Sequence, residues 1–365
     1  MIGRTFGVYI ALRFLRSLLF MVLGLAFLIV SVDFIEQLRK ASGIVDVSMW
    51  DLYLIALLRA PLFVEKAFPF ACLFAAMMTL TQMNTKMELV VARAAGVSAW
   101  QFLLPISLSA AATGVLLAGV YNPLAVHASQ KAKDLAVSVF SQGSYDANRA
   151  IIRGYWIKQE DIGGGHTIIN AETARRQGSV LDNVKILRFD SDGKFLQRID
   201  AANVIHRGDH WMINSASVIA EDGNTTANVS TKLPTSLTRD ELLGKSGKPE
   251  EISFWDLREV AERVEKSGTN GKPYLVQYHS LTALPAFLFA MVLVAAGVCL
   301  RFVRFGQVGR MILGGILCGF VLYTVTSLIT ALGSNGVVPP VVAAWSPGFV
   351  AILFGMSVLL HQEDG

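Results

Sequence analysis

The residues of this sequence that could take part in catalysis are few and poorly spaced for it. His206 and His210 bracket a turn, but no cysteine or carboxylate stands at a spacing typical of a metal site. We therefore expect both histidines to be surface residues of a strand pair. The string nearest to a phosphate-binding loop, Arg239 to Ser246, has arginine where the first glycine must turn the backbone around phosphate. We therefore predict no catalytic residue, no metal site and no site of nucleotide hydrolysis in this chain.

A different chemistry, the docking of a partner, is indicated by a short segment between two apolar runs. Thr85 and Glu88 have the spacing of a capping box, Ser98 and Gln101 repeat it, and Gly96 is a helix stop between them. An apolar stripe at helical spacing follows this predicted helix: Met83, Met87, Val90, Val91 and Ala94. Two interpretations stay open: a helix that rests on the membrane surface with Glu88 only as a cap, or a docking helix for a cytoplasmic motor.

The elements around this segment are identified by missing charge. Residues 97–130, 273–300 and 311–362 contain no Asp, Glu, Lys or Arg. An α-helix needs about 20 mostly apolar residues to cross the hydrocarbon core of a bilayer, so the chain is predicted to be an integral membrane protein. Of its 60 charged residues, 40 lie in residues 131–272, which therefore form a domain in water. The net charge of +4 comes without a basic block or aromatic-basic interleaving, which argues against nucleic acid as a partner.

The apolar runs divide into six predicted spans. They are Leu18 to Val32, Ala67 to Met83, Ser98 to Tyr121 (interrupted by Asn122-Pro123), a fourth that ends at Leu300, and a fifth and sixth that the turn residues 333–340 separate. Lys and Arg in short loops favour the cytoplasm, and they flank the first span and separate the fourth from the fifth: Arg4, Arg13, Arg16, Arg301, Arg304 and Arg310. Both termini are then cytoplasmic, and the soluble domain faces the periplasm.

The soluble domain shows the period-two pattern of antiparallel strands. Lys185 to Phe189 and Phe195 to Ile199 flank a turn with Gly193, and a second strand pair flanks Gly208. Such strands predict a sandwich or jelly roll. The predicted organisation is a membrane block with three spans and a coupling segment at 85–96 (1–130), a helical stalk (131–150), a periplasmic jelly-roll-like β domain (151–250), an amphipathic connecting helix that Gly268 follows (251–272), and a membrane block with three spans (273–365).

The charged residues near the outer face have two possible roles. Basic side chains there could meet an anionic lipid headgroup beside an apolar cavity, or they could be solvated and snorkelling. The predicted spans themselves lack midplane carboxylates, lysines and histidines, which disfavours a secondary transporter.

The six spans, the β domain after the third and two motifs carry a family resemblance. The motifs are Glu88-Leu-Val-Val91 and Ala95-Gly96-Val-Ser98. The chain resembles the lipopolysaccharide-export permeases of Gram-negative bacteria (LptF/LptG type) over nearly its whole length. The segments 33–40, 266–268 and 336–340 look like the G-type subunit of that family.

The resemblance implies a permease of the bacterial inner membrane that pairs with a sister permease (LptF type) above an ABC ATPase dimer (LptB type), which would bind the ATP and Mg. Further implied partners are a single-span periplasmic jelly-roll protein (LptC type), a periplasmic bridge (LptA type) and lipopolysaccharide. The implied coupling helix contains Thr85, Glu88, Leu89, Val90, Val91, Arg93, Ala95 and Gly96. The implied headgroup residues are Arg39, Lys40, Lys131 and Lys133. The implied lateral gate and cavity, on the first and fifth spans, contain Phe27, Val30, Phe34, Phe320, Tyr323 and Leu328.

By this resemblance the chain is a non-catalytic subunit that extracts lipopolysaccharide from the inner membrane for export to the outer membrane. Asp33 and Leu62 depart from the family, in which lysine can stand at those positions. An alternative of another class is a membrane-anchored periplasmic scaffold without its own substrate path.

Overall fold

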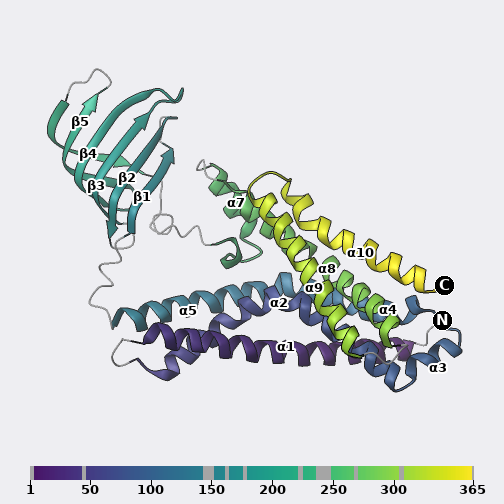
Figure 1. Cartoon of the computed structure of the whole chain (residues 1–365). Coiled ribbons are helices and arrows are strands. Elements are labelled where there is room, and N and C mark those ends of the chain that lie inside the picture. Colours follow the sequence, from purple (N-terminus) through teal and green to yellow (C-terminus); the bar gives the residue numbers. More distant parts are fainter. Residues whose placement is uncertain are drawn as a thin grey trace. The chain divides into compact units, whose positions relative to one another are not determined.

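The computed structural model in Figure 1 describes residues 4–42, 47–142, 152–160, 164–175, 179–220, 225–235, 248–266, 270–303 and 308–363. These residues form two compact units. One comprises Met1–Val137, Glu250–Arg258 and Lys272–Gly365, and the other comprises Ser138–Pro249 and Glu259–Gly271. The string 239–246, Gly268 and Arg304, to which the sequence analysis gave roles, lie outside the described residues.

The first unit is helical and contains six helices long and apolar enough to cross a membrane. In chain order its helices are α1 (Arg4–Ala41), α2 (Met49–Thr85), α3 (Glu88–Ala94), α4 (Ala99–Leu116), the π-helix η1 (Leu117–Tyr121), α5 (Asn122–Gln142), α8 (Lys272–Val303), α9 (Val308–Ser334) and α10 (Pro340–Glu363). Helices α4, η1 and α5 run on without a break, so the six spans of the sequence prediction are confirmed.

The helices of this unit differ widely in how deeply they are buried. In α2 and α8, 61% of the most apolar window is buried, against 6% in α1 and 11% in α9. The shared core consists of side chains from α1, α2, α4 and α8, including Phe14, Leu73, Phe102 and Leu288. Helices α2 and α8 are therefore the packed centre, and α1 and α9 present most of their apolar surface outward.

Two ends of the helical unit can be distinguished (Figure 1). The start of α1, the end of α10 and the short helix α3 lie together at one end, which we call the α3 end. The end of α1, the start of α2 and the turn from α9 to α10 lie at the other end. Between α9 and α10, Gly336 has a φ of +80°, which favours glycine, and Asn335 donates to the carbonyl of Ala331. The predicted division of the long apolar run into two spans is confirmed.

The second unit contains one six-stranded antiparallel sheet in the order β1-β2-β3-β4-β5-β6. The strands are β1 (Ile152–Glu160), β2 (His166–Arg175), β3 (Val180–Phe189), β4 (Phe195–His206), β5 (His210–Ala220) and β6 (Thr225–Pro234). Both predicted hairpins are present as β3-β4 and β4-β5, and Gly193 in the first turn has a φ of +79°. The prediction of a β insertion between the third and fourth spans is confirmed.

The sheet encloses its own core and its two outer strands meet at one end. Alternate residues of the strands, such as Ile186, Val204 and Ile213, are buried against each other. The buried Gln159 of β1 donates to the carbonyl oxygen of Pro234 at the end of β6 (3.0 Å) and accepts from the Trp211 indole (3.3 Å). One amide thus ties the first strand to the last.

The return from the sheet is a 3₁₀ turn, η3 (Pro249–Glu251), followed by helix α7 (Leu257–Lys266). In α7, Leu257, Ala261 and Val264 are buried, as the predicted amphipathic pattern requires.

The close packing of α4 on α8 gives a first prediction. A methyl group on Gly114 would lie 2.6 Å from Cα of Pro285, so Gly114→Ala must push two helices apart, which costs about 1–3 kcal/mol. Gly24→Ala in α1 is the matched control, because nothing lies within 4 Å of its added methyl group. We expect Gly114→Ala to lower the melting temperature of the detergent-solubilised protein by several degrees and Gly24→Ala to leave it unchanged. Equal melting temperatures would contradict the packing described.

Candidate functional site

Helix α3 begins differently from the prediction. The Thr85 hydroxyl hydrogen-bonds the carbonyl oxygens of Thr81 and Gln82, inside the last turn of α2. The N-cap of α3 is Met87, whose backbone is left-handed (φ 60°) and whose side chain makes no capping bond. The predicted capping box of Thr85 is therefore wrong, because the polar side chain satisfies the end of the preceding helix. The Ser98 side chain also makes no capping bond, although Ser98 is the N-cap of α4.

The end of α3 agrees with the prediction. Gly96 has a φ of +82°, its N–H donates to the Arg93 carbonyl (2.9 Å), and the Val97 N–H donates to the Ala92 carbonyl (3.1 Å). This is a Schellman motif, in which glycine turns the chain back and satisfies the last carbonyls of the helix. The stop at Gly96 is confirmed.

Two faces of α3 have opposite surroundings. Leu89 and Ala92 are buried and hold the helix on its own unit. Met87, Val90 and Val91 are 61%, 52% and 66% exposed. We call the exposed set of Met87, Val90, Val91 and Ala94 the α3 apolar face; it is the predicted stripe without Met83, which is fully buried.

The polar neighbours of this face divide between solvent and the protein. Thr85, Arg93, Ala95 and Gly96 are exposed, and the Arg93 guanidinium lies 6.0 Å from the centre of the Phe102 ring. Glu88 points the other way and forms an ion pair with Arg13 of α1. The structure thus places the predicted coupling residues on one short segment, from Thr85 at the end of α2 through α3 to Gly96, but it turns Glu88 inward.

The predicted headgroup cations lie on two elements and most have a carboxylate partner. Arg39 and Lys40, at the end of α1, both pair with Glu36 (2.9 and 3.5 Å). On α5, Lys133 pairs with Glu251, whereas Lys131 is exposed and makes no ion pair with any residue that the structure describes. A ligand at Arg39, Lys40 or Lys133 must therefore compete with an internal carboxylate.

Asp33 has a cationic partner that the sequence did not reveal. Arg59 of α2 donates to the Asp33 carboxylate at 3.1 Å, and Gln37 adds a longer contact. The Arg59 guanidinium also lies 5.6 Å from the Phe63 ring centre. The departure from a basic residue at position 33 is thus balanced within the chain, since Arg59 neutralises the carboxylate.

The interruption predicted at Asn122-Pro123 is a π-helix instead of a helix end. The wider turn η1 leaves carbonyl groups without their usual partners, and the Gly119 carbonyl accepts a hydrogen bond from the Trp255 indole (3.1 Å). Tyr121 donates to the Pro61 carbonyl on α2 (3.1 Å). The helix continues because the Trp255 side chain satisfies a carbonyl of the distorted turn and the Tyr121 hydroxyl fastens this turn to α2.

Asn122 itself joins three segments. Its side-chain amide donates to both carboxylate oxygens of Glu65 (3.0 and 3.1 Å), and its oxygen accepts from the Phe254 N–H (2.8 Å). Asn122 is fully buried, and Glu65 is 8% exposed. Beside this group Lys66 pairs with Glu250. The segment that returns from the β unit is therefore fastened to α2 and α5 through groups that are far apart in the sequence, which is why sequence reasoning missed them.

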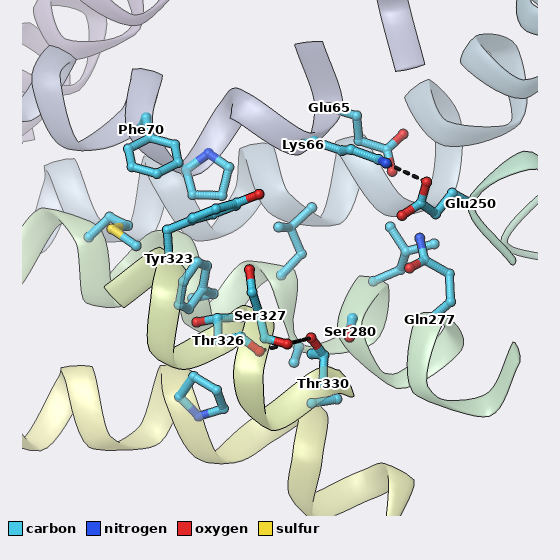
Figure 2. A pocket seen from close by; sticks show the side chains of 18 of the residues that line it. Glu65, Lys66, Phe70, Glu250, Gln277, Ser280, Tyr323, Thr326, Ser327 and Thr330 are labelled. Carbon is cyan, nitrogen blue, oxygen red and sulfur yellow. Dashed lines mark hydrogen bonds and ion pairs between the residues drawn. The ribbon is translucent and has the colours of Figure 1, made fainter. Parts of the chain in front are cut away.

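A pocket of about 310 Å³ lies between α2, α8, α9 and α10 (Figure 2). Its walls are mostly apolar, with Phe70 on α2 and Leu281, Leu284 and Phe287 on α8. Hydroxyl groups of α9 line one side: Tyr323, Thr326, Ser327 and Thr330. The Lys66–Glu250 pair and Gln277 stand at one edge. The pocket therefore combines mostly apolar walls with a charged edge and a row of hydroxyl groups from α9.

The shape of this pocket follows from two glycines of α9. Cβ atoms added at Gly315 and Gly319 would lie 2.5 Å from the Met77 sulfur and 3.1 Å from the Phe70 ring, so α9 touches α2 closely at these positions. One turn further along α9, the bulky Tyr323 replaces glycine, and its ring lies 5.7 Å from that of Phe70. The pocket therefore lies where the residue of α9 that faces α2 changes from Gly319 to the bulky Tyr323.

The predicted gate and cavity residues lie on the two least buried spans. Phe27 on α1 is 75% exposed and Phe320 on α9 is 64% exposed. Tyr323 and Leu328 are also exposed, whereas Val30 and Phe34 are half-buried. Helix α1 packs mainly on α2, and α9 packs on α8 and α10, so the structure does not bring the two sets into one wall.

The two histidines flank the β4-β5 turn of a strand pair, as predicted, and both are half-buried. His206 packs edge-on against the Trp211 ring, and His210 hydrogen-bonds the Asp209 carboxylate at 2.6 Å. This bond lowers the pKa of Asp209 below its ordinary value. No cluster of three or more His, Cys, Asp or Glu suited to a metal ion occurs in the part of the chain that the structure describes.

Comparison with known proteins places these features in context. A model of the family described as "Lipopolysaccharide export system permease LptF/LptG" matches residues 8–361. Two relatives with the name "Lipopolysaccharide export system permease protein LptG" are each 24% identical to this chain: one from Haemophilus influenzae over 369 residues (99% of either chain) and one from Escherichia coli K12 over 354 residues (94% of either chain). The matched region contains all six spans and the β insertion.

The Asn122 junction gives a second prediction. Asn122→Leu removes the donor to Glu65 and the acceptor for the Phe254 N–H, and unsatisfied buried polar groups cost about 1–3 kcal/mol each. We expect a lower melting temperature and faster proteolysis at the return segment near Glu250. Asn335→Leu is the matched control, since the Asn335 side chain donates only to an exposed helix end. A junction variant as stable as this control would contradict the role of Asn122.

Proposed function

The chain belongs to the lipopolysaccharide export permease family LptF/LptG, and from this premise we propose that it is the G-type permease subunit of an ABC transporter. It extracts lipopolysaccharide from the inner membrane and passes it to a periplasmic bridge for export to the outer membrane. The chain is a multi-pass protein of the inner membrane and a lipopolysaccharide export permease by family. The observation that carries the finer proposal is the α3 apolar face, which is exposed at the same end as both termini.

The proposal assigns ATP hydrolysis to a separate ATPase dimer of LptB type, which binds the ATP and Mg. The α3 apolar face supports it, because more than half of the surface of Met87, Val90 and Val91 is exposed while the buried Leu89 and Ala92 hold the opposite side of the helix on its own unit. A helix fixed on one face and apolar on the other is suited to a groove on a partner protein. A sister permease of LptF type would supply the second docking helix.

The orientation follows from this assignment. The ATPase is cytoplasmic, so the α3 end with both termini faces the cytoplasm and the β unit faces the periplasm. Arg310 at the start of α9 and Arg13 and Arg16 near the start of α1 agree with the preference of basic residues for that side. The free edges of β1 and β6 would then meet the sheets of periplasmic partners of LptC and LptA type.

The substrate path of the proposal uses the exposed sides of α1 and α9. Each buried CH₂ group is worth about 0.8 kcal/mol, so a lipid with several long acyl chains must stay in apolar surroundings throughout its transfer. The exposed Phe27 and Phe320, and the apolar pocket beside Tyr323, provide such surroundings. The cations Arg39, Lys40, Lys131 and Lys133 would select phosphate groups through charge-assisted hydrogen bonds of roughly 1.5–3 kcal/mol each.

The docking of the ATPase is tested by Val91→Asp. A charge in the centre of the α3 apolar face must be desolvated on binding, and central interface residues are worth about 2 kcal/mol or more, so we expect ATPase retention by the purified permease pair to fall at least about tenfold. Arg93→Glu is expected to act in the same direction. Val337→Asp is the matched control, because Val337 is 71% exposed at the opposite end. Normal ATPase retention by Val91→Asp would contradict the proposal.

The lipid path is tested with photo-crosslinking residues at Phe27 and Phe320. In cells we expect both positions to capture lipopolysaccharide, and we expect Val350 on α10, which is equally exposed at 62%, to capture only bulk lipid. The readout is a lipopolysaccharide-reactive band above the permease on a denaturing gel. If the first two positions never exceed the Val350 signal, a periplasmic scaffold without a substrate path becomes the better explanation.

A further inference from the structure

Three side chains from two helices form a compact polar cluster at the α3 end. The Arg13 guanidinium donates from Nη1 to Glu88 Oε2 (2.7 Å) and to the Tyr9 hydroxyl oxygen (2.9 Å). The Tyr9 hydroxyl in turn donates to the Glu88 carboxylate oxygens (3.4 and 3.3 Å). We call Tyr9, Arg13 and Glu88 the α1–α3 cluster; each member contacts both others.

The positions of these residues in their helices determine what the cluster connects. Tyr9 and Arg13 are one turn apart on α1 and therefore share a face. Glu88 is the first residue of α3, where a carboxylate also interacts favourably with the free N–H groups. The cluster is thus a direct bond between the first span and the short helix, in addition to the apolar contacts of Leu89 and Ala92.

The surroundings make this bond stronger than a surface ion pair. The side chains of Arg13 and Glu88 are only 12% and 25% exposed. A partly desolvated pair with three mutual hydrogen-bonding partners is less screened than one in water, and loss of either charge leaves the other without a partner in poor solvent. By contrast Arg16, on the same helix, is exposed and makes no ion pair with any described residue.

Helix α1 is suited to carry a displacement from this cluster to its far end. It is continuous from Arg4 to Ala41 and contains no proline, whereas α2, α4, α8 and α10 each contain proline inside the helix. At about 1.5 Å per residue, the 21 residues from Arg13 to Phe34 span roughly 32 Å. Only 6% of its most apolar window is buried, so most of its apolar surface faces outward, while one side of the helix packs along α2 as far as the Asp33–Arg59 pair.

We propose that the α1–α3 cluster couples the docking helix to the first span, with Arg13 and Tyr9 as positioning residues that transmit movement of α3 to the lipid-facing wall. The inference rests on the proposed function, since a motor must act on α3 before the cluster can transmit anything. In this view the Arg13–Glu88 pair serves export by joining the docking helix to the first span. Movement of α3 toward or away from its unit displaces the start of α1, and the stiff helix shifts Phe27 and Phe34 with it.

The test is a charge-reversal cycle in the assembled complex. Arg13→Glu, Glu88→Arg and the double variant are co-expressed with the sister permease and the ATPase, and reconstituted into proteoliposomes that contain lipopolysaccharide. Three quantities are measured: ATPase retained per permease, the rate of ATP hydrolysis, and lipopolysaccharide released per ATP hydrolysed. Arg16→Glu is the matched control, because it reverses the same charge on the same helix outside the cluster.

We expect Arg13→Glu to keep the ATPase bound and hydrolysing while lipopolysaccharide release per ATP falls at least about tenfold, as the loss of a partly buried ion pair implies. Glu88→Arg should lower release per ATP by a similar factor in the complexes that retain the ATPase. The double variant restores the pair with reversed charges and should recover release to within about threefold of wild type. Arg16→Glu should release lipopolysaccharide at the wild-type ratio.

Other outcomes overturn the inference. If Glu88→Arg loses the ATPase and Arg13→Glu in the double variant does not restore it, Glu88 acts on the motor directly. If the single reversals couple as well as Arg16→Glu, the cluster transmits nothing. If the reversals do not assemble, Arg13→Lys and Tyr9→Phe replace them, and unchanged release per ATP in both would be equally decisive. Failure of wild type to retain any ATPase contradicts the proposed function instead.

Discussion

The helical unit depends on one constraint: a charge removed from water must find an opposite charge or a hydrogen-bond donor, because apolar surroundings cannot stabilise it. The Asp33 carboxylate meets Arg59, Glu65 meets Asn122, and Glu88 meets Arg13. Each pair joins two different helices, so the constraint that removes isolated charges also determines which helices are bonded to each other. Apolar packing brings α1, α2 and α4 together, and these polar contacts specify where.

The sequence predicts well what arises within a short stretch of chain. The spans follow from the length of charge-free runs, the end of α3 follows from Gly96, and the β3-β4 hairpin follows from alternation around Gly193. In each case the residues that cause the structure are neighbours in the chain. The coupling residues from Thr85 to Gly96 lie on one short segment for the same reason, and their grouping needs no tertiary contact.

The predictions fail where two local uses of one residue compete, or where a distant segment intervenes. Thr85 satisfies carbonyls behind it instead of N–H groups ahead, and the spacing to Glu88 cannot distinguish these uses. Asn122-Pro123 resembles a helix end, yet the helix continues because Tyr121 and Asn122 find partners on α2. Glu65 and Asn122 are separated by 57 positions, and Lys133 pairs with Glu251 from beyond the whole β unit. Such pairs depend on the complete fold.

The uneven burial of the spans makes mechanical sense when considered with the positions of proline and glycine. Helices α2 and α8 are the most deeply buried spans and contain proline, so they form a shaped centre. Helices α1 and α9 contain no internal proline and present most of their apolar surface outward, yet both are attached along their length. Helix α1 is held by the buried Phe14 near its start and by the Asp33–Arg59 pair near its far end, and α9 is held by the close approach of Gly315 to Met77 and of Gly333 to Ala343. A permease must open and close apolar surface without unfolding, and straight helices that rest with one side on a packed centre can present such surface with little disruption of the core.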